Sequence, residues 1–150
     1  DVTVFDDRPT LANTQHFPAE THFGVSYWDK LLQEPMPKQP AFGLIVTRGH
    51  QHYALVLKEW IRRPFVFLGM IGSRRKARLI FSQFVEEKIA TADEVARVAC
   101  PVGFDILAQS VPEIAVSIMA QLIQKRAERV HGFAERGRGQ AVVECALASG

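Results

Sequence analysis

Uninterrupted apolar runs alternate with helical stripes through the middle of the chain. Residues 42–47 form a run without polar alternation, which predicts a strand buried on both faces of a parallel sheet. A helical stripe follows, made of Tyr53, Val56, Leu57, Trp60 and Ile61. Residues 65–71 form a second run, and a second stripe comprises Ala77, Ile80, Phe81, Phe84 and Val85. This strand, helix, strand, helix order predicts βαβ units and a right-handed parallel sheet.

The N-terminal part of the chain has weaker patterns. Residues 1–9 predict a short strand that runs into a polar turn, whereas residues 10–24 show no periodicity. Residues 25–32 predict a short helix, with Ser26 or Asp29 as its cap. The prolines within residues 35–40 exclude a helix interior or a central strand there.

Two capping boxes indicate helix starts in the C-terminal part. Thr91 and Glu94 have the spacing of the first box, which predicts a short helix ending near Val98. Ser110 and Glu113 have the spacing of the second, which opens a long helix. The apolar stripe of that helix consists of Ile114, Ala115, Ile118, Met119, Leu122 and Ile123. Residues 137–139, in the tail beyond it, are interpreted as part of a frayed terminus rather than as an RNA contact.

Composition narrows the class of protein. A length of 150 residues allows one domain, and 47% apolar with 23% charged residues is ordinary for a globular protein. A net charge of +2 gives no reason to expect nucleic acid as a partner. Cys100 and Cys145 lack zinc or redox spacing, so we interpret them as plain thiols in a reducing compartment. The sequence has neither a long apolar stretch nor a leader, and we therefore expect a cytoplasmic protein without a membrane partner.

The strongest candidate for a binding site is the turn after the second apolar run. Gly69 and Gly72 permit close backbone approach, and Ser73 is a preferred N-cap residue. Free backbone N–H groups at such a helix start can bind an anion. Cationic side chains follow at Arg74, Arg75, Lys76 and Arg78. We predict a phosphate or other anion site here; the alternative is a capped helix with a solvated basic face.

Two further polar stretches come at or near strand ends, where open parallel sheets form their binding crevice. Asp6 or Asp7 is placed to accept hydrogen bonds from a ribose hydroxyl, or else belongs to ordinary turn chemistry. Arg48 and His50 follow the strand predicted at residues 42–47. The acid, the cations and the free amides together suit a nucleotide-like or pterin-phosphate ligand.

Neither catalytic nor metal-binding residues are expected. His50 and His52 would diverge at the start of a helix, because metal-binding pairs on helices are spaced i, i+4. Ser73 has no base nearby in the sequence to activate it as a nucleophile.

One feature of dinucleotide-binding folds is missing. Such folds begin with a strand, a G-x-G-x-x-G turn and a helix, and this fingerprint occurs nowhere in the chain, which opens on what reads as the second strand. We therefore expect the central strand to come from an upstream segment or from a partner chain. If the chain is stable by itself, we predict a homo-oligomer or strand exchange.

With these motifs in hand, the chain resembles the C-terminal Rossmann domain of the XdhC/CoxI family, the accessory proteins of xanthine dehydrogenase and related molybdenum hydroxylases. The resemblance rests on residues 5–9, 47–50 with His52, 69–76, 101–106 and 112–118. It covers residues 1–128 and leaves residues 129–150 as a tail. It implies a three-layer α/β fold with a Rossmann-like parallel sheet that lacks the first strand-turn-helix unit.

The resemblance also implies a chaperone rather than a turnover enzyme. Such proteins bind molybdenum cofactor (molybdopterin), protect it while a cysteine desulfurase exchanges an oxo ligand for sulfur, and pass it to the hydroxylase. By motif, Gly72, Ser73, Arg74, Arg75 and Lys76 would hold a phosphate, Asp6 a polar group of the ligand, and Arg48 and His50 would line the same crevice.

The chain departs from the family pattern at two positions, and two other functions stay open. Leu107 replaces a usual glycine, and Cys100 replaces a small residue without a thiol. The main alternative is an NAD(P)-dependent oxidoreductase that binds a dinucleotide in the same crevice. Another is a basic RNA-binding module that uses residues 74–78 and the tail.

Overall fold

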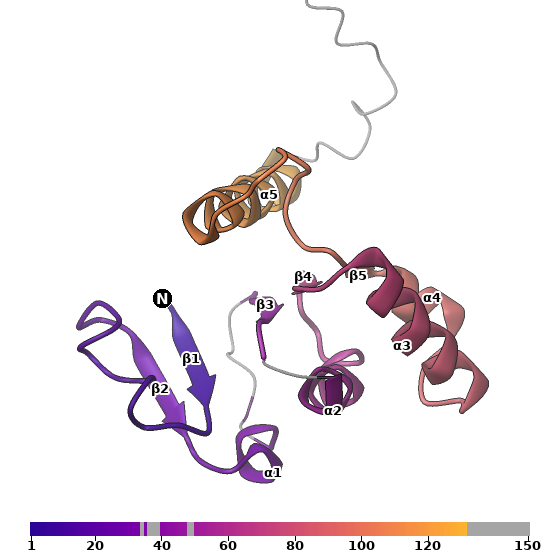
Figure 1. Ribbon diagram of the computed structural model, residues 1–150, viewed down its shortest axis with the longest axis horizontal. Helices are drawn as coiled ribbons and strands as arrows, with labels where there is room; N and C mark the ends of the chain where they lie inside the picture. The colour runs from indigo at the N-terminus through magenta and orange to yellow at the C-terminus, as the bar shows by residue number, and fades with distance from the viewer. Residues whose placement is uncertain (34, 36–39, 48–49, 132–150) are drawn as a thin grey trace, which may run out of the picture. The chain divides into compact units, whose positions relative to one another are not determined.

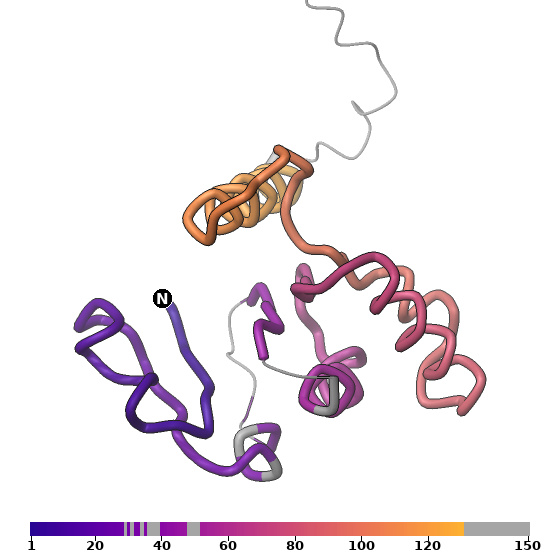
Figure 2. The backbone as a smooth tube through the Cα atoms, in the orientation of Figure 1, coloured from indigo at the N-terminus to yellow at the C-terminus, as the bar shows by residue number. Residues whose placement is uncertain are grey.

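The computed structural model describes residues 1–33, 35, 40–47 and 50–131 (Figures 1 and 2). The chain divides into two compact units, one spanning Asp1–Pro101 and one that begins at Val102. Arg48 and the tail residues 137–139 lie outside the described residues. None of the helices in the described part combines the length and the apolar character that crossing a membrane requires.

The predicted βαβ units form a three-stranded parallel sheet in the first unit. Its strands are β3 (Phe42–Ile45), β4 (Phe67–Met70) and β5 (Val98–Ala99), in the order β3-β4-β5. Helix α2 (His50–Trp60) connects the first two strands, and α3 (Arg74–Glu86) with α4 (Ala92–Ala96) connects the second and third. The α/β class and the parallel sheet predicted from the apolar runs are confirmed.

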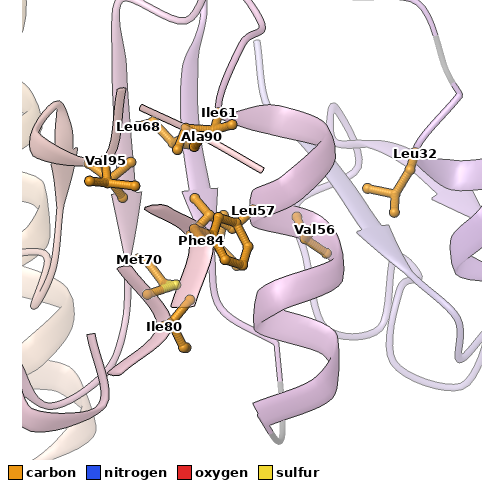
Figure 3. Packing of buried hydrophobic residues seen from close by; sticks show 12 residues of the cluster. Leu32, Val56, Leu57, Ile61, Leu68, Met70, Ile80, Phe84, Ala90 and Val95 are labelled. Atoms are coloured by element: carbon orange, nitrogen blue, oxygen red, sulfur yellow. The ribbon is translucent and has the colours of Figure 1, made fainter. Parts of the chain in front are cut away.

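The core of this unit lies between the sheet and the helices that follow its strands (Figure 3). Leu68 and Met70 alternate with Phe67 and Gly69 along β4, so they project from the same face. They belong to one buried cluster with Val56 and Leu57 of α2, Ile80 and Phe84 of α3, and Ile61, which directly follows α2. Gly43 on β3 leaves room for this packing, because a Cβ there would lie 2.9 Å from a Leu68 methyl carbon.

A second, two-stranded sheet lies in the same unit. Its strands β1 (Thr3–Asp6) and β2 (His22–Val25) are parallel, and α1 (Trp28–Leu31) follows them. Phe5 packs edge-on against Trp60 of α2, with ring centroids 6.3 Å apart. No described strand pairs with the second edge of β1 or of β3. This interruption agrees with a Rossmann-like sheet whose central strand is missing.

The second unit contains one long helix, α5 (Val111–His131), packed against the loop before it. The predicted capping box is present, since the Ser110 N–H donates to Glu113 and the Glu113 N–H donates to Ser110 Oγ. The Gly103 N–H donates to Gln121 Oε1 at 2.8 Å, which joins the loop to the helix.

Several local predictions need correction. Most of strand β2 falls in residues 10–24, where no strand was predicted. The strand is short and its central residues are only half-buried, so its sequence shows no clear alternation. The helix predicted for residues 25–32 is limited to Trp28–Leu31, and its N-cap is Tyr27 without a side-chain hydrogen bond, so neither Ser26 nor Asp29 caps it. The two-residue strand β5 includes Val98, where the preceding helix was predicted to end.

Candidate functional site

The carboxyl ends of the three parallel strands bring residues from distant parts of the chain together. Ile45 pairs with Met70, and Gly69 pairs with Ala99. The residues that follow the strands, Thr47, Gly72 and Cys100, therefore come to the same edge of the sheet. A Cβ placed on Gly72 would lie 3.6 Å from Cys100 Sγ, which puts the thiol directly beside the turn. Gly72 itself has φ +156°, a backbone conformation that other residues rarely adopt.

The start of α3 has the properties of an anion-binding helix terminus. Ser73 is the N-cap, as predicted, and its Oγ accepts a hydrogen bond from the Lys76 N–H at 3.3 Å. Amides in the first turn of a helix lack carbonyl partners within the helix. The first turn of α3 contains no acidic residue that would neutralise the helix dipole. Binding of an anion by Gly72, Ser73, Arg74, Arg75 and Lys76 stays a prediction.

Thr47 supplies a further polar group at the same edge. Its Oγ1 is buried and makes no hydrogen bond within the described part of the chain. A buried hydroxyl without a partner costs free energy, so the site gains when a ligand supplies the missing hydrogen bond. Of the neighbouring predicted residues, His50 is the first residue of α2 and Arg48 is not described.

Cys100 and Tyr53 are site residues that the sequence did not single out. Cys100 is a free thiol, and burial raises its pKa. Burial also raises the pKa of Tyr53, with a smaller contribution from nearby Cys100, so the phenol of α2 and the thiol after β5 share one environment. Both residues pack against the core cluster. The only sequence signal was the departure of Cys100 from the family pattern, because a two-residue strand such as β5 leaves no periodicity.

Asp6 is placed differently from the other predicted residues. It ends β1, in the two-stranded sheet, and its carboxylate accepts hydrogen bonds from Arg8 on both oxygens. These bonds lower the pKa of Asp6, with burial opposing them. No described hydrogen bond or ion pair connects Asp6 to the turn at Gly72.

Arg75 also contributes to a second feature of α3, and its predicted role in holding a phosphate stays a prediction. Its side chain lines a hollow on α3 together with Arg78, Leu79 and Ser82. The backbone of Arg75 remains in the first turn of the helix. Within the described ranges, no three His, Cys, Asp or Glu side chains gather as a metal site would require.

Comparison with known families gives a match over most of the chain. The family model described as the XdhC Rossmann domain matches residues 1–122. The uncharacterized protein YqeB of Escherichia coli (strain K12) is 32% identical over 125 residues, which is 83% of this chain and 23% of that protein. A probable xanthine dehydrogenase subunit of Bacillus subtilis (strain 168) is 24% identical over 125 residues, 83% of this chain and 36% of that protein. The chain thus spans about a quarter to a third of these relatives.

A solved structure gives the same result for the fold. The crystal structure of a xanthine dehydrogenase from Bacillus halodurans superimposes with a TM-score of 0.72 and is 28% identical. The match covers 88% of this chain and 38% of the other.

Proposed function

The chain belongs to the XdhC Rossmann-domain family, and from this premise we propose that it is an accessory domain of a xanthine dehydrogenase-type molybdenum hydroxylase, where it binds and delivers molybdenum cofactor. Two of the similar proteins support the link to such a hydroxylase by name, since both are described as xanthine dehydrogenases or parts of one. The names of these proteins do not mention cofactor binding, which is the part that we propose.

The observation that carries the proposal is the combination of two features at one sheet edge. The start of α3 offers a capped helix terminus without acids, and Thr47 offers a buried hydroxyl that lacks a partner in the described part of the chain. A phosphate monoester would accept hydrogen bonds from the amides and from the hydroxyl, and its charge would be favoured by the helix dipole. These two groups are therefore the ones that we expect to hold the phosphate end of a pterin cofactor.

In this proposal each residue has a defined task. The turn at Gly72 and Ser73 holds the phosphate, and Lys76 and Arg74 add positive charge. Cys100 and Tyr53 line the crevice beside the turn and limit access of water to the bound group. The cofactor supplies the redox centre of the hydroxylase once it is delivered; the domain protects it until then. A cysteine desulfurase that exchanges an oxo ligand for sulfur on the held cofactor would be the second partner.

The dinucleotide alternative has less support. An NAD(P)-binding crevice uses an acid at a strand end to bind the ribose and a G-x-G-x-x-G turn to bind the pyrophosphate, and that turn does not occur in the 150-residue sequence. Arg8 binds both oxygens of Asp6, which weakens a ligand-binding role of this acid for a dinucleotide and for a pterin alike. In the binding test described next, NAD and NADP therefore serve as competitors of molybdopterin.

The first test replaces the N-cap by an acid. Ser73→Asp keeps a good cap but puts a negative charge where the phosphate would bind. We expect the melting temperature to change little and molybdopterin affinity to fall on the order of tenfold or more, since like charges repel at short range in a crevice. Ser73→Ala is the matched control, because it loses the cap without adding charge. Unchanged affinity of Ser73→Asp, or displacement of molybdopterin by NAD, would refute the proposal.

The second test addresses Thr47. Thr47→Val keeps the shape of the side chain and removes the buried hydroxyl. If the hydroxyl serves a ligand, the variant is at least as stable as the natural chain and binds molybdopterin more weakly. A variant that loses stability instead would show that the hydroxyl has a structural partner.

A further inference from the structure

The surface of α3 contains an open hollow with both basic and apolar lining. Arg75, Arg78, Leu79 and Ser82 line it, and its volume is about 420 Å³. These residues are three or four positions apart and form one stripe along the helix. The buried residues of α3, Ala77, Ile80 and Phe84, lie on the opposite side of the helix. The hollow, which we call the α3 hollow, therefore faces away from the core of its unit.

The cations of the α3 hollow have no acidic partners among the described residues. The sequence contains no acidic residue between Glu59 and Glu86. Neither Arg75 nor Arg78 forms an ion pair with any residue that the structure describes, whereas Arg8, Arg62 and Lys125 each pair with a carboxylate. Two guanidinium groups on one helix face thus keep donors that could bind carboxylates with both nitrogens.

The apolar part of the hollow is equally exposed. Leu79 is 66% exposed although it lies beside the two arginines in the stripe. A single exposed leucine is ordinary on a protein surface, but here it lies beside two cations that line the same open hollow. The pattern is complementary to a pair of carboxylates with an apolar side chain next to them.

We propose that the α3 hollow docks an acidic amphipathic segment of a partner protein. Carboxylates of the segment would pair with Arg75 and Arg78, and an apolar side chain would pack on Leu79. Nucleic acid fits less well, because no aromatic side chain among the described residues lines the hollow for base stacking. The proposal goes beyond cofactor binding and does not depend on it, since the phosphate site uses the helix terminus and Thr47.

The probe for this proposal is a synthetic helical peptide of glutamate and leucine, with Glu at i and i+3 and Leu at i+4. We expect it to bind the chain, and we expect Arg78→Glu to weaken binding on the order of tenfold, because attraction becomes repulsion. Leu79→Ser should weaken binding by a smaller factor. Arg78→Gln removes the charge without reversing it and should lie between the natural chain and Arg78→Glu. Arg78 and Leu79 are exposed, so we expect these substitutions to leave the fold intact. Circular dichroism of each variant verifies this.

Matched controls separate specific docking from general charge attraction. Arg97→Glu makes the same charge change at an exposed position outside the hollow and should bind the peptide like the natural chain. A peptide with glutamine in place of glutamate should bind weakly. The proposal is overturned if the acidic peptide does not bind, or if Arg97→Glu and Arg78→Glu lose the same amount of peptide affinity. It is also overturned if an oligonucleotide or pyrophosphate binds more tightly than the peptide and displaces it.

Discussion

The guanidinium of Arg8 donates hydrogen bonds to both carboxylate oxygens of Asp6, from Nε to Oδ1 and from Nη2 to Oδ2, each at 2.8 Å. The Arg8 backbone N–H adds a third hydrogen bond to Oδ1 at 2.9 Å. The acid that ends β1 therefore fixes the turn after its own strand. The sequence offered two interpretations of Asp6, a ligand-binding acid or ordinary turn chemistry, and the pairing with Arg8 agrees with turn chemistry.

The Asp6 pair predicts a specific dependence of stability on pH. The pKa of Asp6 is lowered in the folded protein, so its contribution is present above the unfolded pKa of about 3.9 and is lost as pH falls through the folded pKa. We expect Asp6→Asn to cost about 1 kcal/mol at neutral pH, a value discounted because both side chains are partly exposed. Chemical denaturation of Asp6→Asn and of the natural chain at pH 7 and at pH 3 measures the difference in the free energy of unfolding. A difference between the two proteins that does not shrink at acid pH would contradict this role.

Cys100 should report on occupancy of the crevice. Because burial raises its pKa, the thiol should react slowly with iodoacetamide at pH 7 and faster as pH rises. A ligand at the Gly72 turn should slow the reaction further, since Sγ lies beside that turn. The measurement needs a Cys145→Ser background so that a single thiol is labelled. If Cys100 is labelled fast at neutral pH and molybdopterin does not change the rate, then the thiol is not buried beside the Gly72 turn or the ligand does not bind there.

Gly103 should tolerate no side chain. It has φ +99°, and a Cβ there would lie 2.4 Å from Ser117 Oγ and 3.2 Å from the backbone nitrogen of Ile118. We expect Gly103→Ala to destabilise the loop and α5 by on the order of 3 kcal/mol. Hydrogen exchange of the Phe104 amide, which donates to the Ser117 carbonyl, measures this. Ser117→Ala is the control and should change exchange little; normal protection in Gly103→Ala would contradict the steric argument.

Leu107 predicts a change of the opposite sign in the same loop. It has φ +57°, a left-handed conformation that costs a residue with a side chain about 1–2 kcal/mol, and its side chain is 83% exposed. This conformation is the one that favours glycine. We expect Leu107→Gly to raise stability by about 0.5 kcal/mol, after subtraction of the entropy that glycine gains in the unfolded chain. Leu107→Ala keeps the strain and should give no gain in a thermal melt.

The edges of β1 and β3 that no described strand covers predict self-association of the 150-residue chain. Free edges of parallel strands expose main-chain donors and acceptors that another strand can bind. We expect light scattering after gel filtration to give a mass above that of the monomer. Val46→Lys, at the exposed residue that directly follows β3, should shift the population toward monomer because a lysine at an edge hinders pairing. A monomer at every concentration would contradict the prediction.

The sequence by itself determined the elements with strong patterns. The apolar runs predicted β3 and β4, the stripes predicted α2, α3 and α5, and Ser73, Thr91 and Ser110 predicted helix starts that the structure confirms. These signals are local, because periodicity and capping depend on residues a few positions apart. The order of strand and helix then restricted the connections to parallel βαβ units.

Only the tertiary structure decided which side chains share a site. It brought Thr47, Gly72 and Cys100 to one edge through strand register, bound Asp6 to Arg8 and placed Arg75 in the α3 hollow. It also revealed β2 and β5, whose few residues carry too little pattern to stand out. Contacts between residues distant in the chain depend on packing and on competition among hydrogen-bond partners, and neither is encoded in local spacing.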